Sequence, residues 1–224
     1  MITRAGFQIV RLAEIRWEER VNVDGWPCRA GMYYDDRENG LTLRLIDYPV
    51  GSTEPRHVHP GTHAVTVLKG RAIVDGLTLG PLDLILGPGG EPHGPLHYPD
   101  GCQLLSAFQG SYYHTEVEQI SEQKRYRLVL TEQVPWTEAR GRQEKTLLDE
   151  GPGRLLVQGV RFPAGAEVAA HAHAEVQASL VVEGSALVDG ETFGVWDLLY
   201  VPSGARHGPI SFPSGATLLV LTMR

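Results

Sequence analysis

The sequence predicts an all-β protein that consists of two similar domains in tandem. Two observations carry this prediction. A set of histidines recurs at a constant interval of 114 residues, and short runs rich in Val, Leu and Ile alternate with Gly, Pro and Asp along both halves. A constant interval without gaps indicates an internal duplication, and short, evenly spaced apolar runs are typical of β-sandwiches and barrels. The predicted domains are residues 1–115 and 127–224, joined by a linker over 116–126.

The repeat is anchored by residues that carry chemistry and by residues that shape turns. The histidine set of the first half is His57, His59, His63 and His93, and its counterparts are His171, His173, Gln177 and His207. The turn residues correspond at the same interval, as Gly51 with Gly165, Gly70 with Gly184, Pro88 with Pro202 and Gly90 with Gly204. Each half, at roughly 110 residues, is long enough to bury a core of its own.

The expected strands are the apolar runs between these turns. In the first half they are Leu41–Tyr48, Ala64–Leu68, Arg71–Val74, Leu82–Leu86 and Gln103–Phe108. In the second half they are Leu155–Phe162, Ala178–Val182, Ala186–Val188, Asp197–Val201 and Thr217–Met223. Asp75-Gly76 and Asp189-Gly190 lie between paired runs and predict two-residue hairpins. We interpret Arg127–Leu130 as the first strand of the second half, and we expect Asp83 and Asp197 to support the strand before each ligand loop.

Composition narrows the class of partner. Apolar residues make up 42% and charged residues 21% of the 224 residues, close to the average for globular proteins. A net charge of −7 without a Lys/Arg-rich run argues against nucleic acid or an anionic membrane surface. A small molecule is the expected partner, and a homodimer is left open. Only Cys28 and Cys102 are present, and the charged N-terminal region has no apolar stretch, so we expect a reducing, cytoplasmic location with Cys102 packed in the core.

The histidine spacing predicts metal sites. Alternate side chains of an extended strand share a face, so His57 and His59 point to the same side. The turn at Pro60-Gly61 would return His63 to that side, and His93 would arrive from a separate strand. Clustered imidazoles suit Fe, Mn, Ni, Cu or Zn better than Ca or Mg, so we expect up to two divalent transition metals in the chain. Gln177 offers a weaker, neutral ligand, and neither histidine set contains a carboxylate.

These residues resemble the motifs of the cupin superfamily, and the duplication resembles a bicupin. The family motif G-x5-H-x-H-x3-E-x6-G corresponds to Gly51, His57, His59, His63 and Gly70 and to their counterparts in the second half. The second motif, P-x-G-x-x-H, corresponds to Pro88, Gly90 and His93 and again to their counterparts. The resemblance implies two tandem double-stranded β-helix, or jelly-roll, barrels.

Two positions depart from the family pattern. The family's glutamate is His63 in one half and Gln177 in the other, and the glycine that usually starts the second motif is Leu82 or Trp196. The first set is similar to that of acetylacetone-dioxygenase-like cupins. The second is similar to that of certain cupin cyclases and sugar-acid-converting cupins. The leading segments resemble the cupin domain of zinc-binding anti-sigma factors.

Three further residues are candidates for a role in catalysis. Glu91 precedes the last histidine of the first set and would serve as a general base, the alternative being an exposed loop carboxylate. Arg206 holds a similar place before His207. Arg44 would bind a substrate carboxylate if its strand face points inward.

The motifs favour a metal-dependent dioxygenase that acts on a small enolisable or phenolic substrate. Two alternatives remain open at this point. One is a non-oxidative isomerase, cyclase or hydrolase that uses a Lewis-acid metal, and the other is a small-molecule-binding regulatory protein with a structural metal. Oxygen consumption separates the first two, and the fold alone does not choose among the three.

Overall fold

The computed structural model describes residues 2–4, 6–21, 27–36, 40–110, 112, 115–116 and 125–223. Within these ranges the regular elements are β-strands, apart from the single-turn 3-10 helices η1 (Leu12–Glu14) and η2 (Thr131–Gln133). The prediction of an all-β fold is therefore confirmed. No helix in the described ranges has the length and hydropathy needed to span a bilayer. Most of the predicted linker, residues 117–124, lies outside these ranges.

The chain divides into two compact units. The first barrel is Arg16–Gln133, and the second barrel combines Met1–Ile15 with Val134–Arg224. This division differs from the predicted boundaries at two places. Residues 1–15 belong to the second barrel although they come first in the sequence, and residues 127–133 belong to the first.

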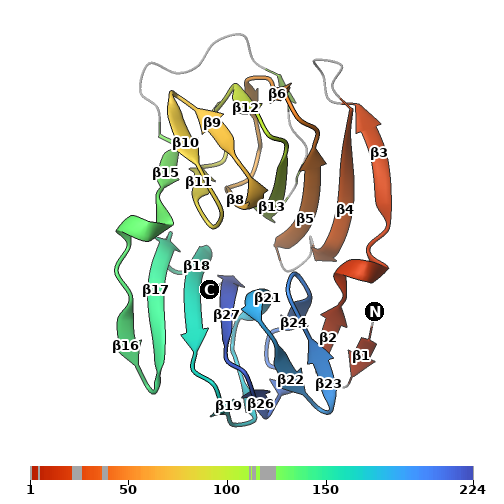
Figure 1. Cartoon of the computed structure of the whole chain (residues 1–224), viewed down its shortest axis with the longest axis vertical. Helices are drawn as coiled ribbons and strands as arrows, with labels where there is room; N and C mark the ends of the chain where they lie inside the picture. The colour runs from red at the N-terminus through yellow and green to blue at the C-terminus, as the bar shows by residue number, and fades with distance from the viewer. Residues whose placement is uncertain are drawn as a thin grey trace. The chain divides into compact units, whose positions relative to one another are not determined.

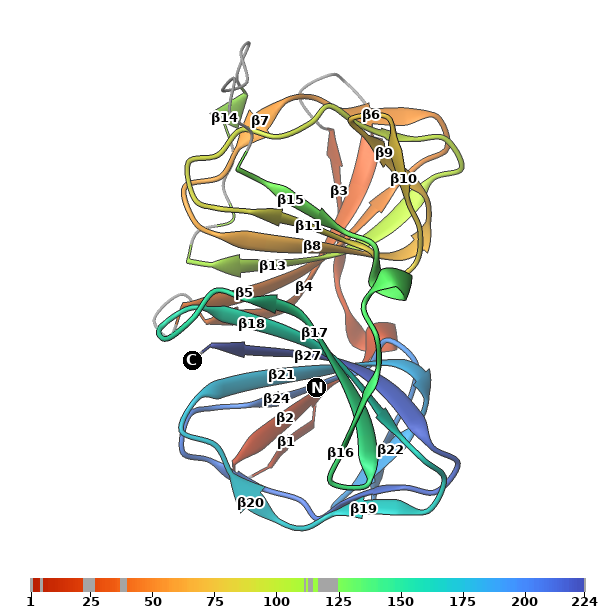
Figure 2. The ribbon, with the colours of Figure 1, turned by 90° about the vertical axis from the view of Figure 1, so that its left-hand side faces the viewer.

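The first barrel is built from two main sheets (Figures 1 and 2). The larger sheet has the order β15 (Arg127–Val129), β11 (Leu84–Gly87), β8 (His63–Gly70), β13 (Cys102–Gln109), β5 (Leu41–Tyr48), β4 (Pro27–Asp36) and β3 (Trp17–Val21). The smaller sheet has the order β10 (Leu77–Leu79), β9 (Ala72–Val74), β12 (Leu96–Tyr98) and β6 (Ser52–Glu54), and β14 (Thr115–Glu116) pairs with β7 (His57–Val58). Side chains that alternate toward the inside of both sheets form one buried core, which includes Val67, Leu79, Ile85 and Leu104.

The second barrel repeats this plan. Its larger sheet has the order β1 (Ile2–Arg4), β2 (Phe7–Val10), β24 (Leu198–Val201), β21 (Val176–Gly184), β27 (Ala216–Met223), β18 (Leu155–Phe162), β17 (Arg142–Asp149) and β16 (Thr137–Ala139). Its smaller sheet has the order β19 (Ala166–Val168), β26 (Ile210–Phe212), β22 (Ala186–Val188) and β23 (Glu191–Phe193), and β20 (His171–Ala172) pairs with β25 (Arg206–His207). Phe162 and Phe212 stack in the core with ring centroids 3.9 Å apart.

The leading strands are exchanged between the two halves of the sequence. β2 pairs with β24 in the second barrel, and β15 pairs with β11 in the first. An aspartate side chain in each barrel holds the segment next to the exchanged strand. Asp197 accepts a hydrogen bond from the Leu12 amide (2.9 Å), and Asp83 accepts one from the Thr131 amide (2.7 Å).

The interpretation of Arg127–Leu130 as the first strand of the second half was therefore wrong, because this strand completes the first barrel. Its apolar pattern predicts a strand correctly. The pattern does not say which open sheet edge the strand will pair with, since edge pairing is made through backbone groups that every strand carries.

The predicted hairpins are confirmed. Asp75 and Gly76 have φ of 51° and 76°, and Val74 pairs with Leu77 across them. Asp189 and Gly190 form the equivalent turn in the second barrel, with φ of 49° and 80°. Two successive positive φ angles define a turn whose twist matches that of the flanking strands.

Candidate metal centre

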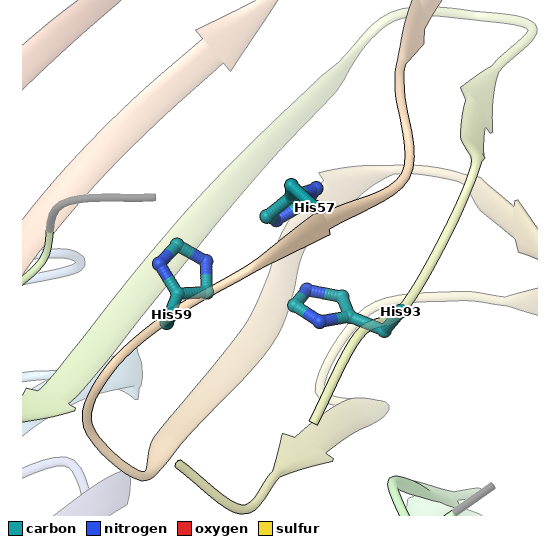
Figure 3. A group of neighbouring side chains, drawn as sticks. All are labelled: His57, His59 and His93. Atoms are coloured by element: carbon teal, nitrogen blue, oxygen red, sulfur yellow. The ribbon is translucent and has the colours of Figure 1, made fainter. Parts of the chain in front are cut away.

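Three histidines of the first barrel form a compact buried group. His57 and His93 lie opposite each other and exchange two backbone hydrogen bonds of 3.0 Å. His59, two residues beyond His57, turns its ring to the same side, and Figure 3 shows the three imidazoles facing a common space. One nitrogen from each ring lies within 4.8 Å of the others. The side chains come from two separate segments, so the group forms only when the barrel folds.

The hydrogen bonding of His57 leaves a lone pair directed at this group. Its Nδ1 donates a hydrogen bond of 2.8 Å to the carbonyl oxygen of Pro55. The proton therefore resides on Nδ1, and Nε2 is the nitrogen that is able to bind a metal. Such a backbone partner for the other ring nitrogen is the usual support of a metal-ligating histidine.

Burial keeps His93 neutral. The pKa of His93 is lowered by burial and then by His57, His63 and His59. A metal requires deprotonated ligands, so this shift favours binding. His93 Nδ1 is buried and makes no hydrogen bond of normal geometry to a described residue. Such an orphaned nitrogen costs about 1–3 kcal/mol, and its presence in a cluster of neutral imidazoles fits a transition metal better than a packed core.

His63 lies beside this group without sharing its space. Its ring centroid is 4.5 Å from that of His59 and 4.7 Å from that of His93, yet its nitrogens are not part of the set within 4.8 Å. The ring packs on Gly87, where a Cβ atom would meet His63 Cε1 at 2.0 Å. Burial, followed by His59 and His57, holds the pKa of His63 well below its usual value. The role of His63 as a fourth ligand stays a prediction.

The second barrel contains an equivalent group of His171, His173 and His207. His171 pairs with His207 across β20 and β25, and His171 Nδ1 donates to the carbonyl oxygen of Ala169 at 2.8 Å. The Nε2 atoms of His171 and His173 are 3.1 Å apart. Two nitrogens bound to one metal at about 2.0–2.1 Å stand roughly 2.9–3.3 Å apart for right-angled to tetrahedral geometry, so this spacing fits a metal.

The second group is more open than the first. His171 and His173 are partly exposed, whereas all three histidines of the first group are buried. Burial and the two neighbouring histidines lower the pKa of His207 to about 4. Gln177 hydrogen-bonds His173 and lines the same cavity, which places it beside the predicted metal.

Each group opens into a cavity. The first cavity has a volume of about 240 Å³ and, apart from the histidines, is walled mostly by apolar residues such as Ile46, Leu96, Leu104 and Phe108. The second is about 660 Å³ and contains His171, His173 and His207. The first cavity suits a small molecule that is held close to the three imidazoles.

Arg44 lies in the wall of the first cavity. Its side chain points inward, as a role in binding a substrate carboxylate requires, and is 8% exposed. Its guanidinium stands 4.4 Å from the ring centroid of Tyr112. Burial, and then the charge of Arg20, lowers its pKa.

The two other candidates lie outside the cavities. Glu91 is 1% exposed and not a loop carboxylate in solvent, because it accepts hydrogen bonds from Arg125 N (2.7 Å) and Nε (2.9 Å). These bonds anchor the segment that leads into β15, which is a structural role. Arg206 is exposed and lines neither histidine-bearing cavity. The sequence position of both residues, next to a ligand, does not predict where their side chains point.

Sequence reasoning missed Glu54. Its Oε1 lies 3.8 Å from His57 Nε2, its Oε2 accepts a hydrogen bond of 2.7 Å from the Tyr98 hydroxyl, and its side chain lines the first cavity. Burial, and then the charge of Glu54, raises the pKa of Tyr98 well above its usual value. A carboxylate thus accompanies the first histidine set after all. The signal was Glu54 itself, three residues before His57 and replaced in the repeat by Val168.

Comparison with known proteins supports the fold. Residues 124–224 match the family described as the ChrR cupin-like domain. A search of curated proteins found no significant match. A candidate dioxygenase from Nostoc punctiforme is similar over 99% of this chain and 84% of its own, with 14% identity and a TM-score of 0.86.

Two other solved structures share the architecture. Salicylate 1,2-dioxygenase from Pseudaminobacter salicylatoxidans matches 83% of this chain and 71% of its own, with 17% identity and a TM-score of 0.65. That enzyme has also been solved as an adduct with gentisate. A deletion mutant of Bacillus subtilis oxalate decarboxylase matches 100% of this chain and 78% of its own, with 16% identity and a TM-score of 0.69. At such low identity these likenesses establish the fold alone.

The paired motifs, the two jelly-roll barrels and the match over the C-terminal half lead to one conclusion. Residues 124–224 match the ChrR cupin-like domain, and the chain as a whole has the fold of two cupin barrels in tandem.

Proposed function

We propose that the first barrel is a metal-dependent dioxygenase that acts on a small enolisable or phenolic substrate. The buried group of His57, His59 and His93 at the end of a small, largely apolar cavity carries this proposal. Three protein ligands leave open positions on a metal ion, as catalysis requires. Imidazole ligands suit iron among other transition metals, and the open positions of a ferrous centre would receive substrate and O₂.

The chain's own residues prepare the site for such a substrate. The three neutral imidazoles leave a divalent ion close to its full charge, which favours an anionic enolate or phenolate oxygen. The apolar walls exclude water from the reacting groups. Glu54, held by Tyr98, presents a hydrogen-bond acceptor beside His57. When bound, a ferrous ion would supply the activation of O₂, and the protein would supply orientation.

We also propose a second metal site at His171, His173 and His207, with Gln177 beside it. The 3.1 Å separation of the His171 and His173 Nε2 atoms supports it. Its greater exposure and larger cavity favour the first barrel as the site of the chemistry.

A non-oxidative reaction is the second candidate. The likeness to oxalate decarboxylase covers the whole chain, and Glu54 brings a carboxylate to a site where the motifs alone provide none. A Lewis-acid metal with an adjacent carboxylate suits reactions that pass through an enolate. Oxygen uptake distinguishes this candidate from the dioxygenase.

The test begins with metal content. Elemental analysis of protein reconstituted anaerobically with Fe(II) should give about two equivalents per chain. The double variants His57→Ala/His93→Ala and His171→Ala/His207→Ala should each lose one.

Oxygen consumption is then measured with a panel of β-diketones and phenols. We expect substrate-dependent uptake that survives loss of the second site and disappears with loss of the first. Product formation without oxygen uptake would favour the non-oxidative reaction. A protein that binds no metal at either site would contradict both candidates.

A further inference from the structure

We propose that the first cavity binds a carboxylate group through Arg44, so that its ligand is a small organic acid with an apolar body. That this ligand is also the substrate rests on the proposed function above. Binding of the carboxylate itself does not depend on turnover.

Arg44 is a buried cation that forms no ion pair with any described residue. Its side chain is 8% exposed, and the structure shows no hydrogen bond or ion pair between it and any of the residues described. Charged side chains are rarely so buried unless they are paired, and an unpaired buried charge is costly. The ring of Tyr112 offsets part of this cost, but a ring face is not a counter-ion for the guanidinium.

The surroundings of Arg44 favour an anion. Arg20 lines the same cavity, and its positive charge, which an ion pair with Glu18 (2.6 Å) partly offsets, acts on Arg44. The Glu54 carboxylate lines this cavity as well, beside His57. Ser106 lies directly opposite Arg44 on the neighbouring strand and also faces the cavity, so its hydroxyl is placed to donate a second hydrogen bond. A carboxylate accepts such donors on both of its oxygens, and its pairing with guanidinium is the strong, bidentate kind.

The second barrel lacks this arginine. The position of Arg44 is taken by Gln158 in the second barrel, and the position of Ser106 by Val220. Gln158 and Val220 are opposite each other and line the second cavity, as Arg44 and Ser106 do the first. The duplicated fold is therefore complete with a neutral pair at this place. The buried charge of the first barrel is a feature of its ligand and not of the scaffold.

Size and polarity define the rest of the ligand. The first cavity, at about 240 Å³, corresponds to the share of roughly eight water molecules. Most of the other side chains that line it are apolar, such as Ile46, Leu104 and Phe108. A carboxylate attached to a single ring or a short apolar chain fits both the charge and the volume.

The experiment measures binding to metal-free protein by calorimetry. Benzoate and acetate are the anionic probes, benzamide is the neutral analogue of benzoate, and chloride keeps the ionic strength constant. Wild-type protein should bind benzoate at least tenfold more tightly than benzamide. Arg44→Gln, which installs the residue of the repeat, should weaken benzoate binding roughly 10- to 100-fold and abolish the preference. Arg44→Lys should retain part of the preference for benzoate over benzamide.

Arg29→Gln is the matched control, since Arg29 is an exposed arginine of β4 that pairs with Asp47 and does not line the cavity. It should bind benzoate as the wild type does. As a second readout, benzoate should raise the melting temperature of the wild type and leave that of Arg44→Gln unchanged.

The proposal is overturned if wild-type protein binds neither anion, if it binds benzoate and benzamide equally, or if Arg44→Gln binds benzoate normally. Because no metal or oxygen is present, a failure here is separate from a failure of the dioxygenase proposal. Loss of oxygen uptake with intact benzoate binding would contradict only the latter.

Discussion

The contact between Gly87 and His63 makes a quantitative prediction. Gly87 pairs with His63 across β11 and β8, and a Cβ atom at Gly87 would lie 2.0 Å from Cε1 and 2.4 Å from Nε2 of the imidazole. Carbon atoms in contact normally stand about 3.5–4.0 Å apart, so in Gly87→Ala the ring must move by roughly 1.5 Å. His59, His93 and Phe108 surround it and leave it little room.

The expected cost follows from this overpacking. Extra atoms in a well-packed interior destabilise by about 1–3 kcal/mol. For a chain of this size that corresponds to a fall of about 2–12 °C in melting temperature. Urea unfolding of the metal-free protein, followed by tryptophan fluorescence, measures the free energy directly.

Two further variants make the result specific. Gly80→Ala is the matched control in the same barrel, because its new Cβ would meet no atom closer than 3.9 Å. The double variant His63→Ala/Gly87→Ala should be more stable than the sum of the single changes predicts, with a coupling of about 1 kcal/mol or more. If Gly87→Ala is as harmless as Gly80→Ala and the coupling is zero, the ring of His63 does not rest on Gly87. The His63 ring would then be available to bind the metal, and its placement outside the group of His57, His59 and His93 would be refuted.

Three more predictions follow from the site and the core. Glu54→Gln should weaken metal binding at the first site about 10- to 100-fold in chelator competition, with the second site as internal control, because outer-shell partners contribute on that scale; equal affinities would remove Glu54 from the metal site. The metal-free protein should lose stability as pH falls from about 6.5 toward 4, because the pKa of His207 is about 4 in the folded state, so the unfolded chain takes up the proton first. Urea titrations at pH 7.0, 5.5 and 4.5 check this, and His207→Gln should reduce the dependence, to which His63, His93 and His173 also contribute because their pKa values are lowered too; an unchanged slope would exclude His207 as a source. Both thiols should resist a thiol reagent at pH 8 in the folded protein and react after unfolding, because burial raises the pKa of Cys28 and, with Glu54, that of Cys102 to about 12; rapid reaction of the native protein would contradict their burial.

The repeat and the turn residues were sufficient to predict the fold class and most strand positions. β5, β18 and β22 have the predicted bounds. The aspartate-glycine turns also lie where expected. These features are local, because alternation of side chains and positive φ angles depend on a few consecutive residues. Because the interval of 114 residues is constant, the strands and turns assigned in one half could be assigned to the equivalent residues of the other half.

The histidine motifs likewise predicted which residues meet, for three of the four positions in the first half and for all four in the second, where Gln177 hydrogen-bonds His173. His57 and His59 share a face through strand geometry, and the pairing of His57 with His93 recurs in His171 with His207. This much can be predicted because the spacing of residues within a strand and the length of a repeated turn can both be read directly from the sequence.

Only the tertiary structure decided the remainder. It turned His63 onto Gly87, brought Glu54 to His57, faced Arg44 into the cavity and enclosed Glu91 with Arg125. It also exchanged β2 and β15 between the barrels. Each of these outcomes depends on which strand edges pair and on which side chain fills a given space. Those choices are made by the packing of segments far apart in the chain, and no local pattern encodes them.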